Sequence, residues 1–331
     1  MERPWYRYGA APMVNQSDLA FRLAVVQMGA TATWTQMYTT HDLEDRAVRE
    51  TLLQALQLGR DAPESRDRVT GARTPQIVQL AGDDPDALVR AARHVAPLAD
   101  GIDLNLGCPQ RRAKEGHYGG YLLHPRDWPL LDTIVGALAH ATPLPVSVKI
   151  RLCDYAPDTP KLAVRLAHAG ASVVTLHARH VAIHRRRAHA AKLEYVAQVR
   201  TALDDAQLHA SQPGGHCRVL SNGNVRTFDD ITRNLHDTHA DGVMVGEPLL
   251  DCPHVFAPSI GASLTAHDAM RTYLRLCEAY PLEARVPYVQ QHLQSIVHAG
   301  YAPSRDTRLL LDTLRAAPSV AAMRAYVDTL A

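Results

Sequence analysis

The stretch GIDLNLG (Gly101–Gly107) is a short apolar run bounded by glycines, and the loop CPQRRAKEGHYGG follows it directly. Short runs rich in Val, Ile and Leu are typical of buried parallel strands. Similar runs recur along the chain before and after it. They are Gly9–Val14, Ala30–Tyr38, Gln76–Gly82, Pro145–Leu152, Ser172–Ala178, Arg218–Val225 and Gly242–Leu250.

Helix-like stretches separate these runs, and at least one follows each of the first seven. They cover residues 17–29, 41–56, 84–98, 126–141, 157–170, 190–203 and 227–238. Parallel neighbours in a sheet need crossover connections of this kind. Eight strand–helix units over about 250 residues predict an α/β fold of the TIM-barrel type, (β/α)8. The alternative is an open doubly wound sheet, but no GxGxxG follows any run, so a Rossmann nucleotide site is not indicated.

The pattern changes near Pro258. Residues 263–280, 286–301, 305–317 and 319–331 have helical periodicity with no strand-like run between them. We therefore expect a barrel domain over residues 1–257, followed by a small all-helical C-terminal domain over residues 258–331.

The composition is that of a globular protein with balanced charge. Hydrophobic residues make up 46% of the 331 positions, and 35 basic residues face 34 acidic ones. This balance does not favour a broad polyanion-binding surface. The five cysteines are odd in number and have no CxxC spacing, so we expect neither a disulfide framework nor a metal site. No signal-peptide core or membrane-length apolar run is visible, and we expect a monomer in the cytoplasm, with the nucleus as the alternative.

Polar and small residues occur at the ends of successive strand-like runs, where a barrel places its active site. In chain order they are Pro12, Met13, Gln79, Asn105, Cys108, Lys149, Arg151, His177, Arg179, Asn222, Gly223, Asn224, Gly246 and Glu247. Each alone has an ordinary structural explanation: an ion-paired lysine, a core histidine, a small buried cysteine or a turn. Burying so many polar groups without a ligand would be costly, so together they favour a ligand rich in donors and acceptors.

That ligand needs an anionic part and a ring. The NGN segment (residues 222–224) and the GE pair (246–247) lie where barrels commonly bind phosphate. Gln79, Asn105 and Lys149 can hydrogen-bond a heterocycle. A cation near N1 of a flavin stabilises the reduced anion, and Lys149 suits that role.

Seven segments between about residues 8 and 260 carry a resemblance to a known family. They are APMVNQSDLAFR, VQLAG, DLNLGCPQRRAKEGHYGGYLL, VKIRL, LHAR, SNGNV and ADGVMVGEPLLDCPHVF. In these segments the chain resembles the tRNA-dihydrouridine synthases, which are FMN-dependent barrels. NLGCPQ…AKEGHYG and the glutamate after Gly246 are similar to the eukaryotic-type branch that modifies D-loop uridines 16 and 17. The resemblance implies reduction of uridine to 5,6-dihydrouridine in tRNA, with NADPH or NADH reducing the FMN.

The resemblance also implies residue roles. The expected cofactor-binding residues are Pro12, Met13, Val14, Gln79, Lys149, His177, Asn222, Gly223, Asn224, Gly246 and Glu247. The expected substrate-binding residues are Asn105, Arg111, Arg112, Lys114, Arg151 and Arg179. Cys108 matches the catalytic acid. Hydride addition to C6 of uridine leaves enolate character at C5, and a protonated thiol can supply the proton needed there.

The loop after Cys108 is expected to close over a flipped-out base, with glycines between Gly116 and Gly120 giving it freedom. A second basic stretch, His180–Lys192, follows the sixth run and is expected to contact RNA phosphates. For both stretches, a solvated charged surface is the alternative. In the family this second stretch often contains glycine, where this chain has RRRAHA, and Ala178 also replaces a glycine.

Two other functions remain open at this point. One is flavin-dependent reduction or oxidation of a free pyrimidine, against which the appended helices and basic loops argue. The other is RNA binding without catalysis, against which the presence of Cys108, Lys149 and His177 argues.

Overall fold

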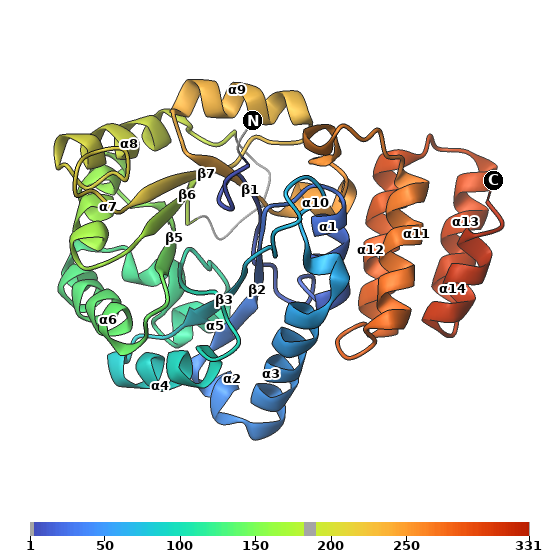
Figure 1. The fold of residues 1–331 in the computed structure, drawn as a ribbon, viewed down its shortest axis with the longest axis horizontal. Helices are drawn as coiled ribbons and strands as arrows, with labels where there is room; N and C mark the ends of the chain where they lie inside the picture. Colours follow the sequence, from blue (N-terminus) through green and yellow to red (C-terminus); the bar gives the residue numbers. More distant parts are fainter. Residues whose placement is uncertain (1–2, 182–189, 331) are drawn as a thin grey trace.

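Eight parallel strands close into a barrel in sequence order, with β1 pairing to both β2 and β8 (Figure 1). This computed structural model describes residues 3–181 and 190–330. The strands are β1 Tyr8–Ala10, β2 Ala32–Thr39, β3 Gln76–Ala81, β4 Gly101–Leu106, β5 Val146–Leu152, β6 Val173–His180, β7 Arg218–Asn222 and β8 Gly242–Val245. The predicted (β/α)8 barrel is confirmed.

Side chains alternate between the barrel interior and the surrounding helices, as the period of two in a strand requires. Trp34, Ile77 and Val173 belong to an apolar cluster inside the barrel. Neighbouring positions such as Leu104 and Val148 join the much larger cluster between strands and helices. The polar residues at the strand ends therefore lie above a solid core.

Helices surround the barrel, and a second group follows β8. They are α1 Leu19–Gln27, α2 Thr40–Glu44, α3 Arg46–Asp61, α4 Pro85–Val95, α5 Arg111–Glu115, α6 Trp128–Ala141, α7 Thr159–His168, α8 Glu194–Asp205, α9 Phe228–Thr238, α10 Glu247–Asp251, α11 Ala266–Ala279, α12 Val286–Gly300, α13 Arg305–Ala316 and α14 Val320–Val327. Several begin with local capping: Asp18 accepts from the Phe21 N–H, and Thr227 forms a capping box with Asp230.

Several predicted boundaries were wrong, and three of the differences have a clear local reason. β1 ends at Ala10 rather than Val14, and Pro12, which has no N–H to donate to a ladder, follows it. β8 ends at Val245, because the segment predicted as strand up to Leu250 turns into α10, with Pro248 in its first turn. The helix predicted over residues 41–56 is interrupted at Asp45, whose extended backbone caps α3.

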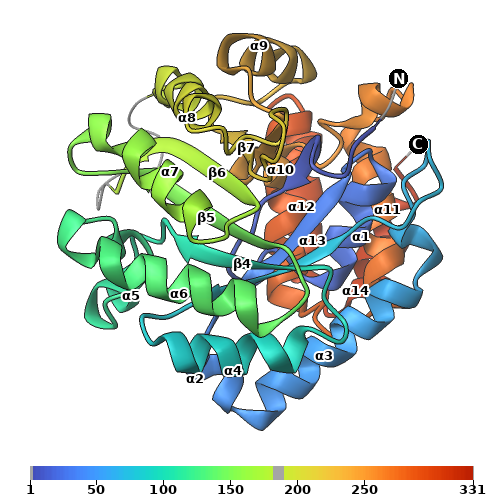
Figure 2. The same cartoon turned by 60° about the vertical axis from the view of Figure 1, so that its left-hand side comes forward.

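The C-terminal helices α11–α14 stand beside the barrel on the α1 side (Figures 1 and 2). They share a core with α1: Phe21 stacks on His292 of α12 with ring centroids 4.5 Å apart, and it meets Tyr273 of α11 edge-on at 6.0 Å. Glu283, between α11 and α12, accepts the Leu19 N–H at 2.8 Å at the start of α1. The C-terminal helices therefore pack against α1, the helix that follows β1.

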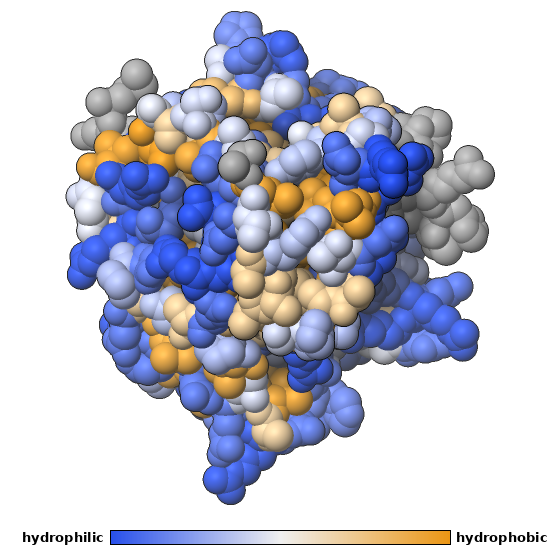
Figure 3. Space-filling view, turned by 90° about the vertical axis from the view of Figure 1, so that its right-hand side faces the viewer, coloured by the Kyte–Doolittle hydropathy of each residue, from blue (hydrophilic) through white to orange (hydrophobic). Residues whose placement is uncertain are grey.

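The surface on the side of the C-terminal helices is mainly hydrophilic and is interrupted by patches of hydrophobic residues (Figure 3). Within residues 3–181 and 190–330, no helix combines the length and the apolar character needed to cross a bilayer.

Candidate active site

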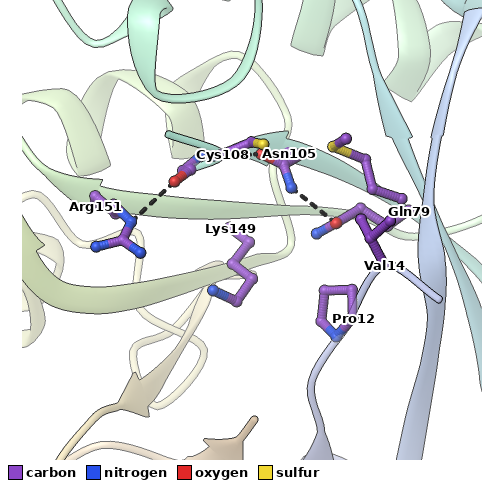
Figure 4. A pocket seen from close by; sticks show the side chains of 9 residues that line it. Pro12, Val14, Gln79, Asn105, Cys108, Lys149 and Arg151 are labelled. Atoms are coloured by element: carbon purple, nitrogen blue, oxygen red, sulfur yellow. Dashed lines mark hydrogen bonds between the residues drawn. The ribbon is translucent and has the colours of Figure 1, made fainter. Parts of the chain in front are cut away.

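A pocket opens at the C-terminal ends of β1 to β5, with about 520 Å³ of empty space that includes its open mouth. Its lining residues are Pro12, Val14, Met37, Gln79, Asn105, Gly107, Cys108, Lys149 and Arg151 (Figure 4). Seven of the nine belong to the predicted site. Met13, also predicted, does not line this pocket; its backbone is held by Ser17 through a 2.9 Å hydrogen bond.

One wall of the pocket is a chain of side-chain amides. Asn105 donates from Nδ2 to Gln79 Oε1 at 2.8 Å (Figure 4). The Asn105 oxygen accepts the backbone N–H groups of Gly107 at 3.0 Å and Cys108 at 2.9 Å. Gln79 in turn donates from Nε2 to Asp103 Oδ2 at 2.6 Å. The chain therefore links the barrel interior to the backbone of the cysteine.

Lys149 points into the pocket from β5 (Figure 4). Burial, together with the positive charge of Arg151, lowers the pKa of the Lys149 ammonium to about 8, while Asp103 opposes this shift. Among the described residues, the ammonium has no hydrogen bond and no ion pair within 4 Å. A cation placed this way favours an anionic or electron-rich ligand in the pocket.

His177 lies on β6, three residues before the strand ends, and is the register partner of Arg151 on β5. Burial lowers its pKa well below the ordinary value, and the charges of Lys149, Arg151 and Arg179 add to the effect. Arg179 Nη1 donates to His177 Nε2 at 3.0 Å. Because a guanidinium can only donate, Nε2 is the acceptor and the proton of the neutral ring sits on Nδ1. His177 can therefore offer one N–H to a ligand.

Arg151 bridges two backbone segments at the mouth of the pocket. Its Nε donates to the Gly107 carbonyl at 2.8 Å, and Nη1 donates to the His180 carbonyl at 3.1 Å. Burial, with the charge of Arg179, lowers its pKa to about 10, so the side chain stays charged at neutral pH. It thus joins the ends of β4 and β6 while facing the pocket.

Cys108 is 9% exposed and sits on a tightly packed loop. Its carbonyl accepts the Gly120 N–H at 3.1 Å. At Gly119, where φ is +66°, a Cβ would come within 2.9 Å of Cys108 Cβ and 3.1 Å of its carbonyl oxygen. These glycines were expected to give the loop freedom to close. In the structure they allow it to pack against the cysteine backbone.

The basic residues after Cys108 lie on α5 at the rim. Arg111, Arg112 and Lys114 are all exposed. Arg111 is paired with Glu115 through a 2.6 Å contact from Nε. Arg112 and Lys114 leave a local positive charge beside the pocket.

The predicted phosphate-side residues lie at the ends of β7 and β8, outside the lining of the pocket. Asn222 donates to the Met244 carbonyl at 2.7 Å, and Asn224 binds both backbone groups of Ala191 at 2.7 and 2.8 Å. Both asparagine side chains thus have structural partners. Gly223 and Asn224 have positive φ values of 137° and 53°, a turn that can present backbone N–H groups. Gly246 and Glu247 begin α10.

The second basic stretch falls mostly outside the described residues, since 182–189 are not among them. At its end, Lys192 donates its backbone N–H to the Ala178 carbonyl at 2.7 Å. Within the described parts of the chain, no cluster of three or more His, Cys, Asp or Glu side chains could hold a metal ion.

Sequence reasoning missed three residues at this site: Met37, Gly107 and Asp103. Met37 lies near the end of β2 and has an apolar side chain, so a pattern of polar groups at strand ends does not include it. Gly107 was treated only as a strand boundary. Asp103 was hidden inside an apolar run, although it is two residues before Asn105 and therefore on the same face of β4.

The fold and the pocket together define a TIM-barrel protein with a strand-end pocket that is lined by a thiol, two side-chain amides and a lysine. The dihydrouridine synthase (Dus) family matches residues 9–314 of the chain. The chain belongs to this family.

Named relatives agree with the family assignment. The chain is 31% identical over 318 residues to a mouse tRNA-dihydrouridine(16/17) synthase-like protein, covering 96% of this chain and 60% of that one. It is 29% identical over 286 residues to the tRNA-dihydrouridine(16/17) synthase of Schizosaccharomyces pombe, covering 83% and 64%. For the Saccharomyces cerevisiae protein of that name, identity is 32%, with coverage of 74% and 53%. The chain thus spans about 53–64% of the length of these relatives.

Solved structures share the fold at low sequence identity. A 2-naphthoyl-CoA reductase has a TM-score of 0.55 at 10% identity, covering 77% of this chain and 50% of that one. A morphinone reductase has a TM-score of 0.50 at 12% identity, covering 78% and 87%. At these identities the likeness supports the barrel alone.

Proposed function

We propose that this protein is an FMN-dependent tRNA-dihydrouridine synthase that reduces uridine to 5,6-dihydrouridine in the D-loop, at position 16 or 17. The observation that carries the proposal is the joint presence of Cys108 and Lys149 on one strand-end pocket, in a chain that belongs to the dihydrouridine synthase family. The names of the mouse and yeast relatives, which carry 16/17, support the proposed position.

The pocket residues fit FMN. Lys149 brings a cation that no described carboxylate pairs within 4 Å, and an electron-rich flavin edge would complement it. Gln79 and Asn105 supply polar amides to the ring, with Pro12 and Val14 forming the apolar side. His177 would hold the ribityl chain. The turn at Gly223 and Asn224, with Gly246 and Glu247, would hold the phosphate. Met13, which is outside the pocket lining, would support the loop under the ring.

FMN held by these residues would, once reduced, supply hydride chemistry at C6 of the uracil. The charge that develops at C5 and O4 then needs a proton. The Cys108 thiol, held by the Asn105 amide at its backbone, would donate its proton to C5. Its thiolate must then be reprotonated from solvent. Asn105, Arg151 and Arg179 would orient the base, since each lies at a strand end around the pocket.

The proposed partners are tRNA and a nicotinamide dinucleotide. The relatives' names carry NAD(P)(+), which supports NADPH or NADH as the reductant. Arg111, Arg112 and Lys114 on α5 would contact tRNA phosphates beside the pocket. The helices α11–α14 would provide a further surface for the tRNA.

The test begins with the visible spectrum of the purified protein, followed by anaerobic NADPH and then unmodified tRNA. Flavin bands that bleach with NADPH and return with tRNA are expected, together with dihydrouridine at position 16 or 17 in mapped tRNA. Return of the bands only with a free pyrimidine would replace tRNA by a small substrate. A protein that binds tRNA but cannot be loaded with FMN would overturn the proposal in favour of RNA binding alone.

A further inference from the structure

Asp103 is a carboxylate at the centre of the barrel that the proposed chemistry does not use. It lies in the middle of β4 and is 0% exposed. Its register partners are Gln79 on β3 and Ser147 on β5. Burying a carboxylate costs more than burying an apolar side chain of similar size, so packing alone does not explain an acid here.

The carboxylate determines the direction of the hydrogen bonds above it. An ionised carboxylate only accepts, so Gln79 must direct its NH2 group at Asp103, which it does at 2.6 Å. The Gln79 oxygen then faces Asn105 and accepts from it at 2.8 Å. The Asn105 oxygen is thereby left to accept the Cys108 N–H at 2.9 Å. Ser147 donates to the other carboxylate oxygen.

We propose that Asp103 is a positioning residue of the flavin site: it acts through Gln79 to hold one orientation of the amide wall and of the Cys108 backbone, and its charge supports the Lys149 ammonium. The inference rests on the proposed function, because the amide wall would face FMN and the uracil. Asp103 itself does not line the pocket.

The charge of Asp103 has a second effect, on Lys149 in the same pocket. It opposes the lowering of the Lys149 pKa, which burial and the nearby Arg151 together bring to about 8. Asp103 is itself surrounded by Ser147, Gln79, Lys149 and the Trp34 indole, and burial raises its pKa to about 6. At neutral pH it is therefore mostly ionised and helps Lys149 to remain an ammonium.

Two substitutions of Asp103 separate its effect on the direction of the amide hydrogen bonds from the effect of its negative charge. Asp103→Asn can still accept from Gln79 through its oxygen while its NH2 group donates to Ser147, so the amide wall should survive without the charge. Asp103→Leu removes both the acceptor for Gln79 and the negative charge. The matched control is Asp100→Asn, which changes a carboxylate that pairs with Arg73 and accepts the Gln76 N–H at 2.8 Å, outside the pocket lining.

The measurement is titration of the full-length apoprotein with FMN, followed by the pH dependence of the bound-FMN spectrum. Asp103→Leu should weaken FMN binding by about tenfold to a hundredfold, the usual cost of an unpaired buried amide. Asp103→Asn should bind FMN within about threefold of the wild type, far less than the loss of a buried hydrogen bond. In the wild type, titration of Lys149 should change the bound-FMN spectrum near pH 8. Asp103→Asn should move this spectral break to lower pH, since Lys149 loses a neighbouring anion. Asp100→Asn should change neither readout.

Two outcomes would overturn the inference alone: equal FMN affinity for Asp103→Leu and wild type, or a spectral break at the same pH in Asp103→Asn and wild type. If Asp103→Leu does not fold, as judged by circular dichroism, the pH break of Asp103→Asn still decides. A wild-type protein that binds no FMN would instead remove the proposed function, and the inference with it.

Discussion

The side-chain oxygen of Asn105 accepts the backbone N–H of Cys108 at 2.9 Å. The thiol is therefore attached to a backbone that the end of β4 fixes directly. The loop beyond it is fixed as well, because the Cys108 carbonyl accepts the Gly120 N–H. A proton donor has to be held within hydrogen-bond reach of its target, and this double attachment restricts where the thiol can be.

Cys108→Ala should remove the proton donor and leave the cofactor site intact. We expect dihydrouridine formation to fall by about 10²–10⁴-fold, the usual contribution of general acid catalysis. Loading with FMN and its reduction by NADPH should be unchanged, because in the proposed mechanism the cysteine donates only the final proton. The measurement is single-turnover oxidation of reduced flavin by tRNA. Cys252→Ala, a half-buried cysteine outside the pocket lining, is the control and should behave as wild type.

Lys149→Met should make bound FMN harder to reduce. Loss of the ammonium should move the midpoint potential to more negative values by on the order of 30–60 mV for a two-electron couple. In the wild type, the increase in midpoint potential that Lys149 provides should decline as pH rises through about 8, where the ammonium loses its proton. Redox titration between pH 6 and 10 measures both effects. Lys161→Met, which removes an exposed lysine paired with Asp158, should show neither; a parallel pH dependence in Lys149→Met and wild type would contradict the prediction.

Gly119→Ala should displace the loop that follows Cys108. The new Cβ would lie 2.9 Å from Cys108 Cβ at a φ of +66°, so the cysteine has to move. We expect kcat to fall by on the order of tenfold to a hundredfold with FMN affinity unchanged. Gly71→Ala is the matched control: its φ is +69°, but no atom lies within 4 Å of the new Cβ. It should lower thermal stability through backbone strain alone and keep full activity.

Substitution of Arg112 or Lys114 by alanine should weaken tRNA binding without changing FMN reduction. Each loss should reduce the slope of log K against log salt concentration by about 1, as expected for one phosphate contact. Arg111→Ala should have a smaller effect, because that side chain is already paired with Glu115. Filter binding across a salt series distinguishes these variants, and an unchanged slope in Lys114→Ala would assign α5 to a solvated surface.

The fold and most of the pocket could be predicted from the sequence because both follow from short-range rules. The run at Gly101–Gly107 and its counterparts have the length and composition of buried strands, and barrels place functional groups at strand ends. Gln79, Asn105, Cys108 and Lys149 meet in one pocket for this reason.

What could not be predicted depends on contacts between distant residues. The close approach of Gly119 to Cys108 requires the loop to fold back over eleven positions, and no local pattern reports it. The pairing of Asn224 with Ala191 likewise joins two separate loops. Asp103 was missed because a single acid does not change the apolar character of its run.

Along β4, successive side chains alternate between the inner and the outer face of the barrel. Asp103 and Asn105 share the inner face, while Leu104 and Leu106 belong to the apolar cluster between the strands and the outer helices. Substitution of one residue leaves this alternation unchanged. Deletion of one residue between Gly101 and Asp103 would shift the pairing by one position and exchange the two faces. The carboxylate and amide would then point at the helices, and two leucines would point into the pocket. This short segment should therefore tolerate substitutions far better than changes in its length.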